Sequence, residues 1–221
     1  MTETLQSKLD AFKAGFVSKV PADVLEVMGR ATEELRASGQ AARAVQPGAP
    51  LPAFSLPNQG GEIVRSEALL ARGPLVLSYF RGAWCPYCMI ELEALAAAAP
   101  AFAAEGASLV VVTPQSAGRS REMATAKGFA FDVLTDEGLA YAGQLGLVFE
   151  LPAPVQAIYK GFGIDLPTHN GPAAGWRLPM PTRLVVGQDG RVRDAQIEAD
   201  YTIRPDPMET LAVLRRSKAA A

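Results

Sequence analysis

The chain has little of several residue types that define whole classes of proteins. It contains two cysteines and one histidine among 221 residues, so one copy can build neither a disulfide scaffold nor a four-ligand zinc site. Its net charge of −2 leaves no basic surface for nucleic acid or an anionic membrane. No uncharged apolar run is long enough to span a bilayer, and the polar start MTETLQSKLDAFK lacks a signal peptide's apolar stretch. We therefore expect a cytoplasmic protein without nucleic-acid or membrane partners.

The pattern of apolar residues in the first 44 residues predicts a helical extension. Apolar residues recur every three or four positions over residues 5–16 and again over 24–35, which predicts two amphipathic helices. These helices pack on the main domain or form a dimer contact with a second copy, and packing is the favoured interpretation because helical apolar stripes usually bury themselves. The Pro/Gly-rich stretch VQPGAPLPAF then marks the boundary to a domain spanning residues 45–221.

The pattern of this domain predicts an α/β fold. Buried strands at 74–80, 107–113 and 129–134 are separated by helices, which favours a central, partly parallel sheet with helices on both faces. Pro100 is expected to bend or end the first of these helices. Residues 149–180 are rich in proline and glycine and predict a long irregular insertion. A hairpin about Asp189-Gly190 and a last helix from Asp206 complete the chain.

Both cysteines lie in one short segment, FRGAWCPYC, directly after the first buried strand. This places Cys85 at the start of a helix, where unpaired N–H groups and the helix dipole favour the reactive thiolate. Pro86 suits the first helical turn because its missing N–H costs nothing there. Cys88 lies one turn inside, close enough to attack a mixed disulfide or a sulfenic acid on Cys85. We therefore assign Cys85 as the nucleophile and Cys88 as the resolving cysteine.

Three other interpretations of the cysteines remain open, and each is weaker. A metal site or a bridged iron–sulfur cluster would have to be shared between two chains, because only His169 could join the cysteines as a ligand. His169 itself is expected to be an exposed loop residue rather than a general base. Two inert core thiols are a poor explanation for a C-P-x-C turn at a helix start. No metal is therefore expected in the site.

The cysteine segment resembles the active site of thioredoxin-fold proteins, with Trp84 and the C-x-x-C in matching places, and its Pro-Tyr dipeptide is similar to that of glutaredoxins. The stretch PMPT resembles the loop whose cis-proline faces the cysteines in that fold. The resemblance implies that Pro181 is this cis-proline and that its neighbours offer a backbone edge to a substrate. Residues implied in the active-site environment are Arg81, Trp84, Pro86, Tyr87, Met180, Pro181, Thr182 and Arg183.

Further stretches resemble the peroxiredoxin and alkyl-hydroperoxide-reductase branch of this fold. They are PGAPLPAFSLPNQGGEI, GFGIDLP and DAQIEADYTIRPDP, and together the likeness covers about residues 45–215. It implies a thioredoxin-fold, peroxiredoxin-like domain that cycles Cys85 and Cys88 between dithiol and disulfide. Peroxide would be the substrate, a thioredoxin- or glutathione-type system the electron donor, and no cofactor would be needed. The alternative within the same fold is a protein disulfide reductase with little peroxidase activity.

The sequence also departs from these relatives. Peroxiredoxins carry a threonine three residues before the reactive cysteine, whereas this chain has Gly82, so peroxide reduction is expected to be slower than disulfide exchange or equal to it. An arginine beside the thiolate is implied by the family, and Arg81 and Arg183 are the candidates. Thioredoxins carry a buried aspartate where this chain has Tyr79. An apolar entrance at Trp84 and Tyr87 would favour organic hydroperoxides over hydrogen peroxide.

Overall fold

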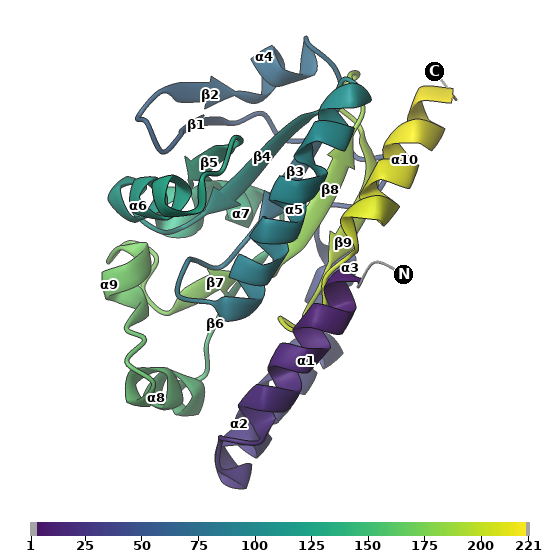
Figure 1. The fold of residues 1–221 in the computed structure, drawn as a ribbon. Helices are drawn as coiled ribbons and strands as arrows, with labels where there is room; N and C mark the ends of the chain where they lie inside the picture. The colour runs from purple at the N-terminus through teal and green to yellow at the C-terminus, as the bar shows by residue number, and fades with distance from the viewer. Residues whose placement is uncertain (1–3, 220–221) are drawn as a thin grey trace.

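The computed structural model describes residues 4–219, and a five-stranded sheet forms its centre (Figure 1). In spatial order its strands are β5 (Asp132–Thr135), β4 (Ser108–Thr113), β3 (Leu75–Tyr79), β8 (Thr182–Val186) and β9 (Val192–Ile197). β3 pairs in parallel with β4 and β4 with β5, whereas β8 runs antiparallel to both β3 and β9. This mixed sheet confirms the expected thioredoxin-fold architecture.

Helices cover both faces of the sheet because successive strand side chains point to opposite sides. On one face, alternate valines such as Val76 and Val111 pack against α1 (Leu5–Val17), α5 (Pro86–Ala104), α6 (Ala117–Lys127) and α10 (Pro207–Ala219). Figure 1 shows α5 crossing the sheet with α10 beside it. On the other face, Leu77 and its neighbours pack against α4 (Ser66–Leu70) and α7 (Ala140–Gln144), which follows the 3₁₀ turn η1 (Glu137–Leu139).

Helix α5 carries the cysteines at its first turn and runs along the sheet. Its length and hydropathy would also allow it to cross a membrane, but one third of it is buried inside this fold, where it packs on α1, α10 and β4. The helix continues past Pro100 to Ala104, so Pro100 does not end it. The reason is that Pro100 is exposed, so the carbonyl group that loses its N–H partner can bond to water instead.

The N-terminal extension contains α1, α2 (Ala22–Ala37) and the short α3 (Gln40–Arg43). Helix α1 is docked on the domain: Leu5 and Leu9 are buried against α5, and the Leu5 amide donates to the Asp206 carboxylate at 3.0 Å. Helix α2 has no fully buried side chain and lies against α8. A dimer contact through α2 therefore stays a prediction.

Residues 149–180 are more regular than the sequence predicted. They contain α8 (Ala153–Gly161) and α9 (Leu166–Asn170), while β6 (Val148–Glu150) pairs with β7 (Arg177–Pro179). The prolines do not break these helices, since Pro154 and Pro167 lie in the first helical turn, where the missing N–H has no intrahelical partner to lose. The remaining strands, β1 (Ser55–Pro57) and β2 (Ile63–Arg65), form a separate hairpin.

Candidate active site

Cys85 lies where the chain leaves β3 and enters α5. It is the N-cap residue of α5, and Pro86 occupies the first helical position. The Cys85 amide donates to the Gly82 carbonyl at 3.1 Å, which closes the turn between strand and helix. The unpaired N–H groups and the positive end of the helix dipole therefore lie beside the Cys85 sulfur. This position favours a thiolate.

Cys88 lies in the first turn of α5, next to Cys85. Both are free thiols, and the two side chains are 3.2 Å apart. Both are also buried, with Cys85 1% and Cys88 0% exposed. A bond between the two sulfurs therefore requires only a small local movement, whereas a large reagent reaches neither of them in this conformation.

The Arg81 guanidinium is the charged group nearest to Cys85. Its Nη2 donates to the Cys85 Sγ at 3.4 Å, and its Nη1 donates to the Tyr159 hydroxyl at 3.2 Å. The same guanidinium lies over the rings of Trp84, 5.0 Å from the centroid, and Tyr201, at 4.4 Å. Two aromatic faces thus hold a buried cation at the thiol, where it stabilises negative charge on sulfur.

A second buried arginine contacts Cys88. The Nη2 of Arg204 lies 3.5 Å from the Cys88 Sγ, and its Nε donates to Glu91 Oε2 at 2.5 Å. The other Glu91 oxygen, Oε1, accepts from Arg183 Nη2 at 2.6 Å and from the Ser78 hydroxyl at 3.3 Å. Glu91 on α5 therefore joins two arginines from distant parts of the chain beneath the cysteine pair.

Arg183 does not lie beside the thiolate, although the sequence made it a candidate for that place. Its hydrogen bonds go to Glu91, to the Pro205 carbonyl at 2.9 Å and to the Thr210 hydroxyl at 3.3 Å. The physical reason is its place in the middle of the sheet on β8, where it faces the interior carboxylate of Glu91. Arg81, the other candidate, contacts Cys85.

The surrounding charges separate the pKa values of the two thiols. Burial by itself raises the pKa of Cys85, but a hydrogen bond from Cys88 and the charges of Arg81 and Arg204 outweigh it and hold that pKa well below its usual value. Burial, reinforced by the hydrogen bond and charge of Cys85, raises the pKa of Cys88 well above its usual value. At neutral pH the pair is therefore a Cys85 thiolate beside a Cys88 thiol.

We expect iodoacetamide to alkylate Cys85 before Cys88 at pH 6. An ordinary thiol of pKa about 8.5 is well under 1% ionised at that pH, whereas the depressed pKa of Cys85 keeps it as thiolate. Its alkylation rate should therefore stay constant as the pH falls until that lowered pKa is reached. Peptide mass spectrometry after short labelling measures both sites, with Cys85→Ser as the control. Preferential labelling of Cys88 would reverse the assignment.

The turn before Cys85 has no room for a side chain at Gly82. Its φ of +142° lies in the region that favours glycine, and an added Cβ would meet the Trp84 Nε1 at 2.4 Å. That indole nitrogen donates to the Asn170 amide oxygen at 3.4 Å, and Asn170 donates back to the Arg81 carbonyl at 3.3 Å. The indole therefore fills the space that a threonine side chain would occupy.

The prediction of a cis-proline at Pro181 is wrong, since no peptide bond among residues 4–219 is cis. The neighbouring backbone is already paired: the Met180 amide donates to the Leu147 carbonyl at 2.9 Å, and the Pro181 carbonyl accepts from Glu198 at 3.0 Å. The Thr182 hydroxyl donates to the Met180 carbonyl at 2.9 Å. Met180 and Thr182 are thus buried, and this stretch offers no free edge to a partner.

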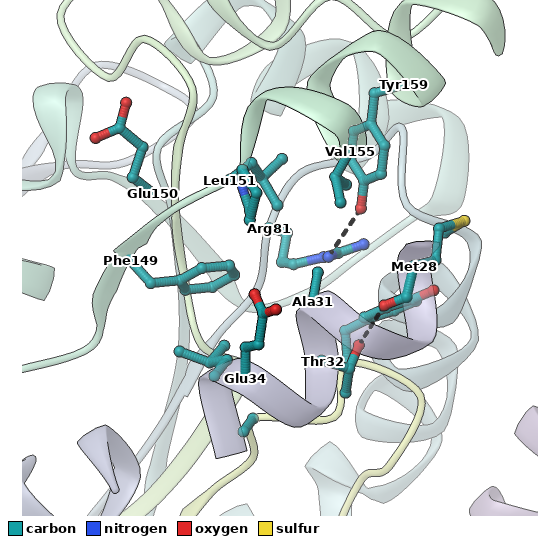
Figure 2. Close-up of a pocket in the computed structure, with 14 residues that line it drawn as sticks. Met28, Ala31, Thr32, Glu34, Arg81, Phe149, Glu150, Leu151, Val155 and Tyr159 are labelled. Carbon is teal, nitrogen blue, oxygen red and sulfur yellow. Dashed lines mark hydrogen bonds between the residues drawn. The ribbon is translucent and has the colours of Figure 1, made fainter. Parts of the chain in front are cut away.

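Two adjoining cavities lead to the cysteine. The smaller, about 70 Å³, is lined by Cys85 and by aromatic side chains from α1, α8 and the Trp84–Tyr87 turn. The larger, about 180 Å³, lies between α2 and α8 (Figure 2). Residues lining both cavities are Met28, Arg81, Tyr159 and Tyr201. Trp84 and Tyr87 therefore form an apolar wall, and Arg81 is the cation facing both cavities.

Within residues 4–219, no cluster of three or more His, Cys, Asp or Glu side chains could hold a metal ion.

Sequence reasoning did not assign roles to Glu91, Arg204, Tyr159 or Asn170. Arg204 belongs to the DYTIRPDP stretch, which resembles peroxiredoxins, but that resemblance assigned no role to this arginine. Glu91 was detectable as a charge three residues after Cys88, on the same helical face. Tyr159 and Asn170 lie in the insertion, where no local pattern indicates that a side chain folds back toward Cys85.

Comparisons with known proteins identify the family of this domain. A sequence model described as the AhpC/TSA family matches residues 47–195. A comparison with curated protein sequences finds no match.

Solved peroxiredoxin structures share the fold. Peroxidoxin BcpB of Mycobacterium tuberculosis superimposes with a TM-score of 0.61 at 24% identity, covering 78% of this chain and 97% of its own. Peroxiredoxin Q of Xanthomonas campestris gives 0.59 at 19% identity, covering 78% and 96%. Reduced Prx3 of Vibrio vulnificus, in complex with H₂O₂, gives 0.60 at 20% identity, covering 77% and 99%. At these identities the likeness establishes the fold.

Proposed function

The chain belongs to the AhpC/TSA family, and from this membership and the buried cysteine pair we propose that it is a thiol peroxidase. The Cys85 thiolate attacks one oxygen of the peroxide, an S–O bond forms as the O–O bond breaks, and the other oxygen leaves as water or an alcohol after taking a proton. The sulfenic acid on Cys85 condenses with the Cys88 thiol, which releases water and forms a disulfide. A thiol donor then supplies two electrons and restores the dithiol.

The observation that carries this proposal is the enclosure of Cys85. The side chain is 1% exposed, and the cavity beside it has a volume of about 70 Å³. In this measure a cavity needs about 10–15 Å³ to hold one water molecule, so this cavity admits hydrogen peroxide or the reacting end of an organic hydroperoxide. A peptide segment does not reach the Cys85 sulfur in this conformation, because that side chain is 1% exposed. Enclosure therefore favours peroxide over the alternative substrate, a protein disulfide.

The same enclosure bears on the electron donor. We propose a thioredoxin- or glutathione-type donor in a reducing cytoplasm, and both are larger than the cavity. Helix α1 covers the approach, since Phe12 and Phe16 line the cavity and the Phe12 ring meets Tyr87 edge-on at 5.1 Å. Reduction of the Cys85–Cys88 disulfide therefore requires α1 to move away from the site.

The proposed function is tested by mixing reduced protein with three oxidants in turn. Hydrogen peroxide, an organic hydroperoxide and a protein disulfide are compared by the second-order rate at which each converts the dithiol to the disulfide. The burial of Cys85 reverses the order that Gly82 led us to expect from the sequence, so we expect both peroxides to react faster than the protein disulfide. The organic hydroperoxide should react fastest because the cavity wall is apolar. A protein disulfide that reacts faster than both peroxides would establish the disulfide-reductase alternative.

We expect Phe12→Ala to accelerate oxidation by the protein disulfide about tenfold, while the rate with hydrogen peroxide changes less than about twofold. Full burial of such a side chain contributes about 1.5–3 kcal/mol. Phe12 is half-buried, so its loss is expected to remove about 1.4 kcal/mol from the cost of opening α1, which is about tenfold in rate. Rapid quenching and mass spectrometry measure both rates. Val17→Ala is the control, since Val17 is exposed on the same helix and lies outside the Cys85 cavity. Unchanged reaction with the disulfide would show that α1 is not the barrier.

A further inference from the structure

The reaction proposed above needs a hydrogen-bond donor for the oxygen that leaves the peroxide. Negative charge develops on that oxygen as the O–O bond breaks, and a positioned donor in a site shielded from water stabilises such charge. The backbone turn before Cys85 supplies no side-chain hydroxyl, because Gly82 has none and its space is filled by the Trp84 indole. The turn does supply the Arg81 guanidinium, but its two Nη groups already donate to Cys85 and Tyr159, so we look for the proton donor on another element around the cavity.

The polar side chains that line the cavity differ in the contacts that their hydrogen-bonding groups make. The Trp84 Nε1 already donates to Asn170, and Tyr201 presents the face of its ring, not its hydroxyl, to Arg81. Tyr87 is edge-on to Phe12 and makes no hydrogen bond to Arg81 among the bonds of residues 4–219. The Tyr159 hydroxyl differs from all of these because it accepts a hydrogen bond from the same guanidinium that contacts Cys85.

One guanidinium group, that of Arg81, donates hydrogen bonds to both the Tyr159 hydroxyl and the Cys85 sulfur. Its Nη1 is 3.2 Å from the Tyr159 Oη and its Nη2 is 3.4 Å from the Cys85 Sγ. Because the guanidinium is planar, its two Nη groups hold both acceptors in fixed directions. Figure 2 shows the Tyr159 hydroxyl and the Arg81 guanidinium directed toward one another inside the pocket.

The Tyr159 proton is available for a substrate. The hydroxyl accepts from Arg81, and among the hydrogen bonds of residues 4–219 it donates none. Burial raises the pKa of Tyr159 above its ordinary value, and the nearby charge of Arg81 lowers it by less, so the phenol stays protonated at neutral pH. Its ring is fixed between Val155, Leu166 and Leu178 in the small apolar core of the insertion.

We infer that Tyr159 is a catalytic residue whose hydroxyl donates its proton to the leaving oxygen of the peroxide while Arg81 holds the Cys85 thiolate. This inference rests on the proposed peroxidase function. As the Cys85 Sγ bonds to one oxygen, the O–O electron pair passes to the other, which takes the phenolic proton and leaves as water or an alcohol. The phenolate that remains beside Arg81 recovers a proton from water.

The test compares Tyr159→Phe with the unchanged protein, using the full chain in its reduced form. We expect the second-order rate with hydrogen peroxide and with tert-butyl hydroperoxide to fall about ten- to a hundredfold, since a hydrogen bond to a charged group has this effect on a rate. Alkylation of Cys85 by iodoacetamide, whose iodide leaving group takes no proton, should change less than about threefold. Tyr141→Phe is the matched control, because it removes a buried hydroxyl that donates to the Pro52 carbonyl, away from the cysteines.

The outcomes separate the inference from the function on which it rests. A slower peroxide reaction with unchanged alkylation supports the donor role of Tyr159. A peroxide rate within about twofold of the unchanged protein overturns that role and leaves the peroxidase function standing. An equal fall in both reactions also overturns it, because Tyr159 would then act only on the reactivity of Cys85. If the unchanged protein does not react with peroxide, the proposed function fails and the inference with it.

Discussion

Replacing Cys85 by serine is expected to abolish reaction with peroxide, because a hydroxyl at this position stays protonated and cannot act as the nucleophile. The surroundings select for sulfur: Arg81 and Arg204 stabilise a thiolate there, and a serine hydroxyl ionises far too weakly for the same charges to generate an alkoxide. Oxidation is measured as the loss of free thiol and the gain of 16 Da or of a disulfide after mixing with peroxide. Persistent oxidation of Cys85→Ser at the original rate would make Cys88 the nucleophile.

Cys88→Ser provides the complementary result. We expect the first oxidation of Cys85 to proceed within about tenfold of the original rate, because the Arg81 contact remains and a serine hydroxyl can still donate a hydrogen bond to the Cys85 sulfur. The sulfenic acid then has no thiol 3.2 Å away with which to condense, so it accumulates and is trapped by a sulfenic-acid reagent. Complete turnover by Cys88→Ser would contradict the resolving role.

The second prediction with a large expected effect concerns the stability of the folded protein, to which the buried Glu91 contributes. We expect Glu91→Ala to lower the free energy of unfolding by about 3–5 kcal/mol, the usual cost of removing one partner from a buried ion pair. Arg183 and Glu91 are each 1% exposed, and Arg204 meets the other carboxylate oxygen, so the substitution leaves two buried cations without their anion. Urea denaturation of the reduced protein measures the loss.

Glu93→Ala is the matched control on the same helix. Glu93 pairs with Lys127 at 2.6 Å, but both side chains are about half exposed, so the loss should be no more than about 1 kcal/mol. Comparable losses for the two variants would mean that the buried pairs of Glu91 contribute no more than the exposed pair of Glu93. A loss below about 1 kcal/mol for Glu91→Ala would show that the two arginines do not need its charge.

The sequence by itself determined the local parts of the site. A valine- and leucine-rich strand followed by C-P-x-C places Cys85 at a helix start, because strand periodicity, proline at the first helical position and the exposed N–H groups are properties of adjacent residues. The same local patterns predicted α1, α2 and the hairpin of β8 and β9. Proline content was a poor guide at residues 149–180, since proline in a first turn starts a helix as readily as it ends one elsewhere.

Only the tertiary structure decided which distant side chains meet the cysteines. Arg81 and Arg183 were equal candidates by sequence, and burial of Glu91 beneath α5 drew Arg183 to the carboxylate while two aromatic rings held Arg81 at the thiol. Pairing of Met180 with Leu147 removed the expected free edge at Pro181. These outcomes depend on which charges share a buried space and which backbone groups are already paired. The contacts of Arg183 with Glu91, of Arg81 with Tyr201 and of Met180 with Leu147 join segments more than thirty residues apart, which no local spacing records.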